Sequence, residues 1–174
     1  YKKEIQIEIN QSSSIIADMV SSCEDSMNLA ALMMIKTIQN EKKIMWCGNG
    51  GSAAQAQHLS AELVGGLKNK KKEPISSISL TADSSFLTAW TNDTDFDTVF
   101  SRQVSALGKE GDILIGLTTS GNSENIIKAI ELANSMKINT IVLTGNNEGK
   151  IRGIGNITIA IPSDDTQRIQ EGHI

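Results

Sequence analysis

The sequence contains little that would indicate a secreted, membrane-bound or nucleic-acid-binding protein. It has only two cysteines, too few for a disulfide framework, which favours a reducing compartment. No apolar run approaches the roughly 18 residues that a membrane span needs, and the N-terminus lacks the apolar core of a secretory signal. The formal net charge of −4 argues against a broad basic surface for nucleic acid or anionic lipid. We therefore expect a cytoplasmic protein without nucleic-acid or membrane partners.

Two local features have ordinary structural explanations. Cys47 lies in an apolar, strand-like stretch, so we expect a small buried side chain rather than a nucleophile. The only basic run, residues 68–72, is interrupted by Asn69 and followed by Glu73 and Pro74. This pattern is typical of a solvated helix end and loop rather than an anion-binding site.

The pattern of apolar residues predicts a single domain with two parts. Only two prolines and no low-complexity stretch occur in the 174 residues, so there is no evident linker. Residues 1–42 show mostly helical spacings, which predicts two N-terminal helices, the second capped by Asp25 or Ser26. An apolar face on these helices would pack against another subunit. From residue 43 onward, strand-like runs at 44–47, 75–80, 113–117, 140–143 and 157–161 alternate with helical patterns at 53–67, 97–107 and 123–136.

Strands that alternate with helices favour parallel pairing and right-handed crossovers. We therefore predict an α/β fold for residues 43–174, a three-layer sandwich with a five-stranded, mainly parallel sheet, preceded by the N-terminal helices. In such sheets, ligands bind beyond the carboxyl ends of the strands. The last residues, "RIQEGHI", also look helical and stop in mid-helix, so we expect the C-terminal helix to be incomplete.

Two strand-to-helix junctions resemble each other, "IMWCGNGGSAAQAQH" at residues 44–58 and "ILIGLTTSGNSENIIKAI" at residues 113–130. Each has an apolar strand, a loop of Gly, Ser, Thr and Asn, and then a helix. Glycines let the backbone approach a ligand, and amide groups at a helix start can hold phosphate oxygens. One such loop is compatible with an ordinary capped turn, but two at equivalent ends of one sheet favour a site for a phosphorylated sugar.

The same loops fit nucleotide sites poorly. Neither contains the Gly-x-x-x-x-Gly-Lys-Ser/Thr pattern of a P-loop NTPase. Gly48, Gly50 and Ala53 satisfy a loose G-x-G-x-x-A dinucleotide pattern, but no acidic residue ends the next strand at the usual distance, and Asp83 comes too late. A nucleotide cofactor is therefore not expected.

His58 and Glu62 are four residues apart on the helix that begins at the first loop, so their side chains share a face. Such a pair alone is compatible with a contact on a helix surface. Its position beside a phosphate-type loop favours an acid/base or metal site instead. An imidazole nitrogen and a carboxylate oxygen at this spacing can bind zinc or a similar divalent ion.

Five segments together resemble the phosphoheptose isomerases, a branch of the sugar isomerase (SIS) domain superfamily. They follow one another in order over nearly the whole chain and read "CGNGGSAAQAQHLSAEL", "TNDTDFDTVFSRQV", "GDILIGLTTSGNSENIIKAIELA", "IVLTGNNEGKI" and "RIQEGHI". The resemblance implies one flavodoxin-like SIS domain over residues 1–174 and a homotetramer that converts sedoheptulose 7-phosphate to D-glycero-D-manno-heptose 7-phosphate. The reaction would begin ADP-heptose synthesis for bacterial lipopolysaccharide or capsule.

The resemblance also assigns residues to the substrate. The first substrate loop corresponds to Asn49, Gly50, Gly51 and Ser52, and the phosphate-holding loop corresponds to Thr118, Thr119, Ser120 and Ser123. Asn92 and Asp93 correspond to an Asn-Asp pair that reaches the substrate, and we expect them to do so from a neighbouring subunit.

For the chemistry, the resemblance implies one zinc ion per subunit. Its ligands correspond to His58, Glu62 and Gln170, which also contact the substrate, and Glu62 corresponds to the catalytic base. Ketose–aldose interconversion moves a proton between C1 and C2 through an enediol, which needs a base and an electrophile at the oxygens. A further catalytic histidine of the family would fall at position 178, four residues beyond the last residue. His173 matches a different family histidine, which we interpret as structural.

A second class of SIS protein has to be weighed against the enzyme. Non-catalytic homologues serve as binding proteins, including tetramers that engage a bacterial replication initiator. They share the "CGNG", Asn-Asp and "RIQE" motifs, so these cannot separate the two functions. Glu62 and Gly51 favour the isomerase, because binding-type relatives tend to lose that glutamate.

Overall fold

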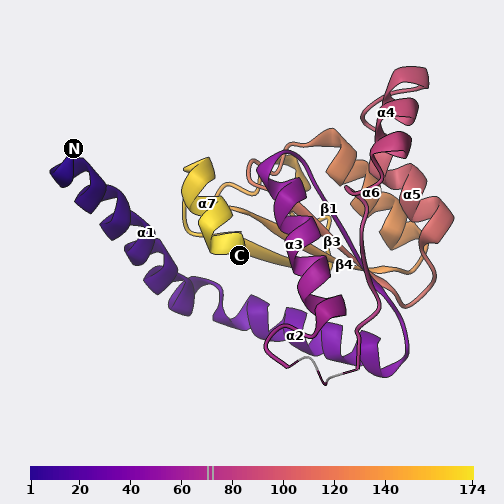
Figure 1. Cartoon of the computed structure of the whole chain (residues 1–174), viewed down its shortest axis with the longest axis horizontal. Coiled ribbons are helices and arrows are strands. Elements are labelled where there is room, and N and C mark those ends of the chain that lie inside the picture. Colours follow the sequence, from indigo (N-terminus) through magenta and orange to yellow (C-terminus); the bar gives the residue numbers. More distant parts are fainter. Residues whose placement is uncertain (70, 72) are drawn as a thin grey trace.

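The computed structural model describes residues 1–69, 71 and 73–174 (Figure 1). Lys70 and Lys72 of the basic run lie outside the described residues. The elements in chain order are α1 (Lys2–Ser22), α2 (Glu24–Gln39), β1 (Ile44–Gly48), α3 (Gly51–Gly65), β2 (Ser77–Ser79), α4 (Ser84–Asp93), α5 (Val99–Leu107), β3 (Ile113–Thr118), α6 (Glu124–Ser135), β4 (Asn139–Gly145), the 3₁₀ turn η1 (Gly149–Ile151), β5 (Ile157–Ile161) and α7 (Thr166–His173).

The five strands form one sheet in the order β2-β1-β3-β4-β5, and every neighbouring pair is parallel. Every residue of β1 and β3 is buried, which explains why these strands appear in the sequence as continuous apolar runs. After β1, the chain forms β2 on one side of β1 and then β3 on the other side of β1. The predicted five-stranded α/β fold is thus confirmed, and the strand order reverses between β1 and β3.

Helices cover both faces of the sheet, because successive side chains of each strand point to opposite sides. Met45 and Cys47 of β1 pack in the core cluster that includes residues of α5 and α6. Ile44 and Trp46 pack in the cluster that includes residues of α2, α3 and α7. These two clusters are the two cores of a three-layer sandwich.

One local prediction is wrong, and one helix was not predicted. Neither Asp25 nor Ser26 caps α2, which already begins at Glu24 after Cys23. Cys23 is fully buried, and its thiol contacts the backbone oxygen of Ala160, so tertiary burial rather than a polar cap sets the break between α1 and α2. The helix α4 was not predicted at all.

The first N-terminal helix, α1, lies largely outside these cores. None of the residues of α1 is buried, and Figure 1 shows α1 extending away from the sheet. Arg168 of α7 is 95% buried and joins the two parts, because its guanidinium pairs with Glu8 of α1 at 2.8 Å. Within the described residues, every helix is too short or too polar to cross a membrane.

Candidate functional site

The two predicted loops lie side by side at the carboxyl edge of the sheet. Gly48, the last residue of β1, is in register with Leu117 near the end of β3. The loop after β1 leads into α3, and the loop after β3 leads into α6. Because the strand order reverses between these two strands, the loops diverge and leave a crevice, which is where open α/β sheets bind ligands.

The first loop, residues 48–51, faces open space at Gly50. Gly50 has φ +54°, and a β-carbon built on it would meet no atom within 4 Å. The backbone oxygen of Asn49 accepts a hydrogen bond from the amide of Ser52, which starts the turn of α3. The first amides of a helix have no intrahelical acceptor, so this loop offers donors to a ligand.

The second loop, residues 118–123, is held tightly from behind. Buried Thr118 donates its hydroxyl hydrogen to Ser123 Oγ at 3.2 Å, and the amide of Asn122 donates to Ser120 Oγ at 3.2 Å. Gly121 has φ +65°, and a β-carbon there would overlap with the backbone oxygen of Glu148. The loop is therefore fixed against the segment after β4, with hydroxyls and the start of α6 beside the crevice.

A small cavity of about 250 Å³ adjoins the second loop. Thr119 and Ser120 line one side, Asn146 and Asn147 after β4 line another, and Asp164 after β5 completes it. Asn147 donates a hydrogen bond to Asp164 at 2.7 Å. Asn146, Asn147 and Asp164 were not among the predicted site residues, although polar residues directly after two predicted strands were a usable signal.

His58 and Glu62 meet on the outer face of α3, as their spacing predicted. His58 Nε2 lies 3.9 Å from Glu62 Oε1, and both side chains are partly exposed. A zinc ion sits about 2.0–2.2 Å from each nitrogen or oxygen ligand, so one ion can bind this pair. The described residues contain no group of three or more His, Cys, Asp and Glu side chains arranged to hold a metal. Among the described residues, a third ligand would therefore be of another type.

Gln170 belongs to α7 and packs against the start of α3. Its backbone oxygen accepts a hydrogen bond from Gln55 Nε2 at 2.6 Å, and its side-chain amide lies against Gly51. Gly51, Gln55, His58 and Glu62 follow one another at helical spacings along one side of α3. His58 and Glu62 lie about 10–16 Å further along the helix axis than Gly51. The candidate site is therefore elongated and runs from the second loop along α3.

Asn92 and Asp93 do not join this site within one chain. They are exposed at the end of α4, where Asn92 donates a hydrogen bond to the Asp93 carboxylate at 2.8 Å. Figure 1 shows α4 standing at the far end of the molecule, beyond α5. Their predicted contact with the substrate of a neighbouring subunit stays a prediction.

The remaining titratable candidates are buried and structural. Burial raises the pKa of the Cys47 thiol to about 12, which confirms a buried side chain rather than a nucleophile. His173, the last residue of α7, is 95% buried, with Nε2 3.3 Å from the backbone oxygen of Thr144. Burial lowers the pKa of His173, although the Thr144 oxygen opposes this shift. Its position agrees with the predicted structural role.

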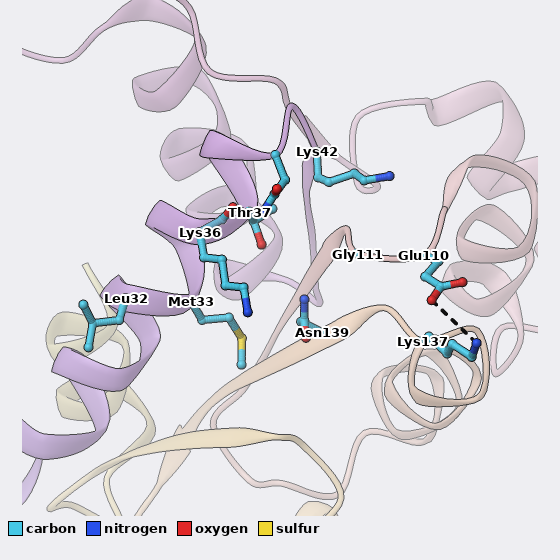
Figure 2. A pocket seen from close by; sticks show the side chains of 10 residues that line it. Leu32, Met33, Lys36, Thr37, Lys42, Glu110, Gly111, Lys137 and Asn139 are labelled. Carbon is cyan, nitrogen blue, oxygen red and sulfur yellow. Dashed lines mark hydrogen bonds and ion pairs between the residues drawn. The ribbon is translucent and has the colours of Figure 1, made fainter.

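The largest hollow lies at the opposite, amino edge of the sheet (Figure 2). It measures about 740 Å³ and is lined by Lys36, Lys42 and Lys137 together with Glu110. Glu110 pairs with Lys137 at 3.6 Å. The hollow contains none of the predicted site residues, so size alone does not mark the site.

Comparisons with known proteins agree with the geometry. Residues 9–145, a span that contains both loops, match the SIS domain family. The phosphoheptose isomerase of Aliarcobacter butzleri is 46% identical over 159 residues, which are 91% of this chain and 84% of that protein. The solved phosphoheptose isomerase of Neisseria gonorrhoeae shares 39% identity with a TM-score of 0.91, covering 99% of this chain and 92% of that one. The solved phosphoheptose isomerase of Francisella tularensis shares 34% identity with a TM-score of 0.94, covering 98% of this chain and 91% of that one.

Proposed function

Because the chain belongs to the phosphoheptose isomerases of the SIS domain family and is an isomerase, we propose that it converts sedoheptulose 7-phosphate to D-glycero-D-manno-heptose 7-phosphate. The observation that carries the proposal is the pair of loops rich in glycine and hydroxyl groups at the reversal of strand order. The first of these loops leads into α3, which also carries His58 and Glu62. A phosphate site and a proton-transfer site thus share one elongated crevice.

The phosphate group binds at the second loop. Thr119, Ser120 and Ser123 place hydroxyl groups there, and α6 begins at this point. A helix start carries a partial positive charge, so it stabilises the phosphate without a lysine. The first loop offers its open amides, next to Gly50, to the sugar end of the same molecule.

Glu62 moves the proton. Its carboxylate removes a proton from C1 of the ketose, the C1–C2 bond gains double-bond character, and the same carboxyl group returns the proton to C2. The hydroxyl group on C1 loses its proton while the oxygen on C2 gains a proton. The carbonyl group thereby moves from C2 to C1, so the product is the aldose. His58 lies against Glu62 and orients the carboxylate.

A zinc ion is part of the proposal. His58 and Glu62 would hold it. Gln170 of α7 would be the third ligand, and its side chain, which lies against Gly51, would have to turn toward the other two. Support comes from the 3.9 Å separation of the first two ligand atoms and from their donor chemistry, one imidazole nitrogen and carboxylate and amide oxygens. When bound, the ion polarises the substrate carbonyl and stabilises the negative charge of the enediolate.

We also propose that the protein is a cytoplasmic homotetramer whose product supplies heptose for lipopolysaccharide or capsule. The exposed apolar side chains of Ile5, Ile9, Leu29 and Leu32 on α1 and α2 support association between subunits. So does the position of α4, whose Asn-Asp pair would meet a site only on another subunit. A monomeric mass by light scattering at micromolar concentration would contradict this.

The direct test is isomerisation of sedoheptulose 7-phosphate by the full protein, with and without a chelator. Turnover by the wild type that disappears in Glu62→Gln would establish the reaction and the base. The chelator result decides whether metal is needed. Absence of turnover in a folded, zinc-loaded wild type would refute the substrate and direct attention to another sugar phosphate.

A further inference from the structure

The two ligand loops are joined directly by a pair of asparagine side chains. Asn49 Nδ2 donates a hydrogen bond to Asn125 Oδ1 at 2.9 Å, and Asn125 Nδ2 donates to Asn49 Oδ1 at 3.0 Å. Asn49 belongs to the first loop, while Asn125 lies in the first turn of α6, directly after the second loop. The pair therefore connects the starts of α3 and α6, which are far apart in the sequence.

Packing alone does not account for this pair. Asn125 is 98% buried, and an asparagine within a helix is unfavourable because its amide competes with the backbone. A buried amide also has to be hydrogen-bonded, and each of these two amides satisfies the other. An apolar residue would fill the same volume, but it would not fix the relative orientation of the two helix starts.

We infer that Asn125 is a positioning residue for the substrate site. The inference rests on the proposed function. The second loop holds the phosphate, and the first loop holds the sugar end, so one ligand binds both only when their separation is set in advance. Fixing that separation before binding raises affinity, because the ligand does not have to order the loops itself.

The same geometry refines the role of Asn49. The resemblance to known isomerases placed this residue at the substrate. Its side-chain oxygen and one of its amide hydrogens already bond to Asn125. Asn49 therefore acts mainly by holding the first loop in place, and the contacts with the substrate come from the neighbouring backbone at Gly50 and Gly51.

The test compares Asn125→Ala, Asn49→Ala and the double variant, using isomerisation kinetics and equilibrium binding of sedoheptulose 7-phosphate and inorganic phosphate. We expect each single variant to raise KM and weaken sugar-phosphate binding by about tenfold, with a smaller change in kcat. Inorganic phosphate, which needs only the second loop, should bind almost as before. The double variant should lose little more than either single variant, because both remove the same bridge.

Asn134→Ala is the matched control. Asn134 lies in the last part of α6, and its amide donates to the backbone oxygen of Ile154 at 2.7 Å, away from the crevice. This variant should lower stability without changing KM or the preference for sugar phosphate over phosphate. If Asn134→Ala and Asn125→Ala behave alike, the role of Asn125 is only structural.

Three further outcomes separate the possibilities. Losses that multiply in the double variant would overturn the bridge, since the two asparagines would then act independently. A much larger loss for Asn49→Ala than for Asn125→Ala would show direct contact of Asn49 with the substrate, which would also overturn it. A wild type that binds the sugar phosphate but does not turn it over would refute the proposed function and leave the bridge open to test. In that case, the ratio of the affinities for sugar phosphate and for inorganic phosphate, compared between wild type and variants, still measures the effect of the bridge.

Discussion

The two edges of the sheet differ in what they present to a ligand. The carboxyl edge has the smaller cavity, about 250 Å³, yet it carries hydroxyl groups and the starts of α3 and α6. The amino edge has a hollow of about 740 Å³ beside the end of α2. The C-terminal end of a helix carries a partial negative charge. Lys36 in the last turn of α2 therefore offsets the charge of the helix dipole.

The interior of the amino edge is also bonded within the chain. The buried carboxylate of Asp112 accepts hydrogen bonds from the amides of Lys43 and Lys109 and pairs with the Lys43 ammonium. Asp112 is thus fully bonded within the fold, whereas the backbone around Gly50 at the carboxyl edge faces open space. The direction and availability of hydrogen-bonding groups identify the site better than cavity size does.

The sharpest test of this difference exchanges one carboxylate of the candidate site and one carboxylate of the amino edge. Glu62→Gln should lower kcat by about 10²–10⁴-fold, the usual contribution of a general base, while the protein stays folded. Glu110→Gln is the matched control at the amino edge and should leave turnover unchanged. Steady-state kinetics of both variants measure kcat and KM for this comparison. Comparable losses in the two variants would remove the functional distinction between the edges.

Asp112→Ala should show the reverse pattern. Its loss leaves two backbone amides without an acceptor and Lys43 without its partner, so we expect the free energy of unfolding to fall by about 2–4 kcal/mol. Turnover measured well below the unfolding temperature should be retained. Chemical denaturation measures the stability change, and a stable variant with a raised KM would show that the amino edge takes part in binding.

The fold could be predicted because buried parallel strands appear as continuous apolar runs, and β1 and β3 are buried throughout. The helix α4 was missed because none of its residues is buried, although Asp83 caps it by accepting a hydrogen bond from the Phe86 amide. Its partly buried apolar residues Phe86, Leu87 and Trp90 pack on the core, but they cover little more than one helical turn, which is too short a run to show a clear period.

The site was only partly predictable for a related reason. His58 and Glu62 are close in sequence, so their spacing alone brought them together. Asn125, Asn147 and Asp164 come to the crevice through strand pairing and through bonds between distant segments, which no local pattern encodes. Their only local signal was a position after an apolar run.

A third comparison separates the two loops at the carboxyl edge. Gly121→Ala forces a residue with φ +65° against the backbone oxygen of Glu148, and we expect a loss of about 2–3 kcal/mol and weaker binding of inorganic phosphate. Gly50→Ala has open space at φ +54°, so only the backbone cost of about 1–2 kcal/mol applies. Thermal unfolding and phosphate titration of both variants check this, and equal losses would contradict the tighter packing of the second loop.

The smallest expected effect concerns pH. Burial lowers the pKa of His173 from its usual 6.5, so the unfolded chain binds a proton more readily than the folded chain does. The contribution of His173 to stability is therefore complete above the unfolded pKa and falls as pH drops through it. Denaturation at about pH 7.5 and about pH 5.5 should show this decline, and His173→Gln should reduce it. An unchanged pH dependence in the variant would assign the decline to other groups.

The strand order also determines when the crevice can form during folding. Strand β3 pairs with β4 across the short connection through α6, whereas its pairing with β1 closes a much longer loop that includes β2, α4 and α5. Long-range pairing costs more chain entropy and slows folding, so the β3–α6–β4 unit should acquire protection from hydrogen exchange before β1 joins it. The phosphate loop would then be complete while the first loop is still unfolded, and the Asn49–Asn125 bridge would be among the last contacts to form.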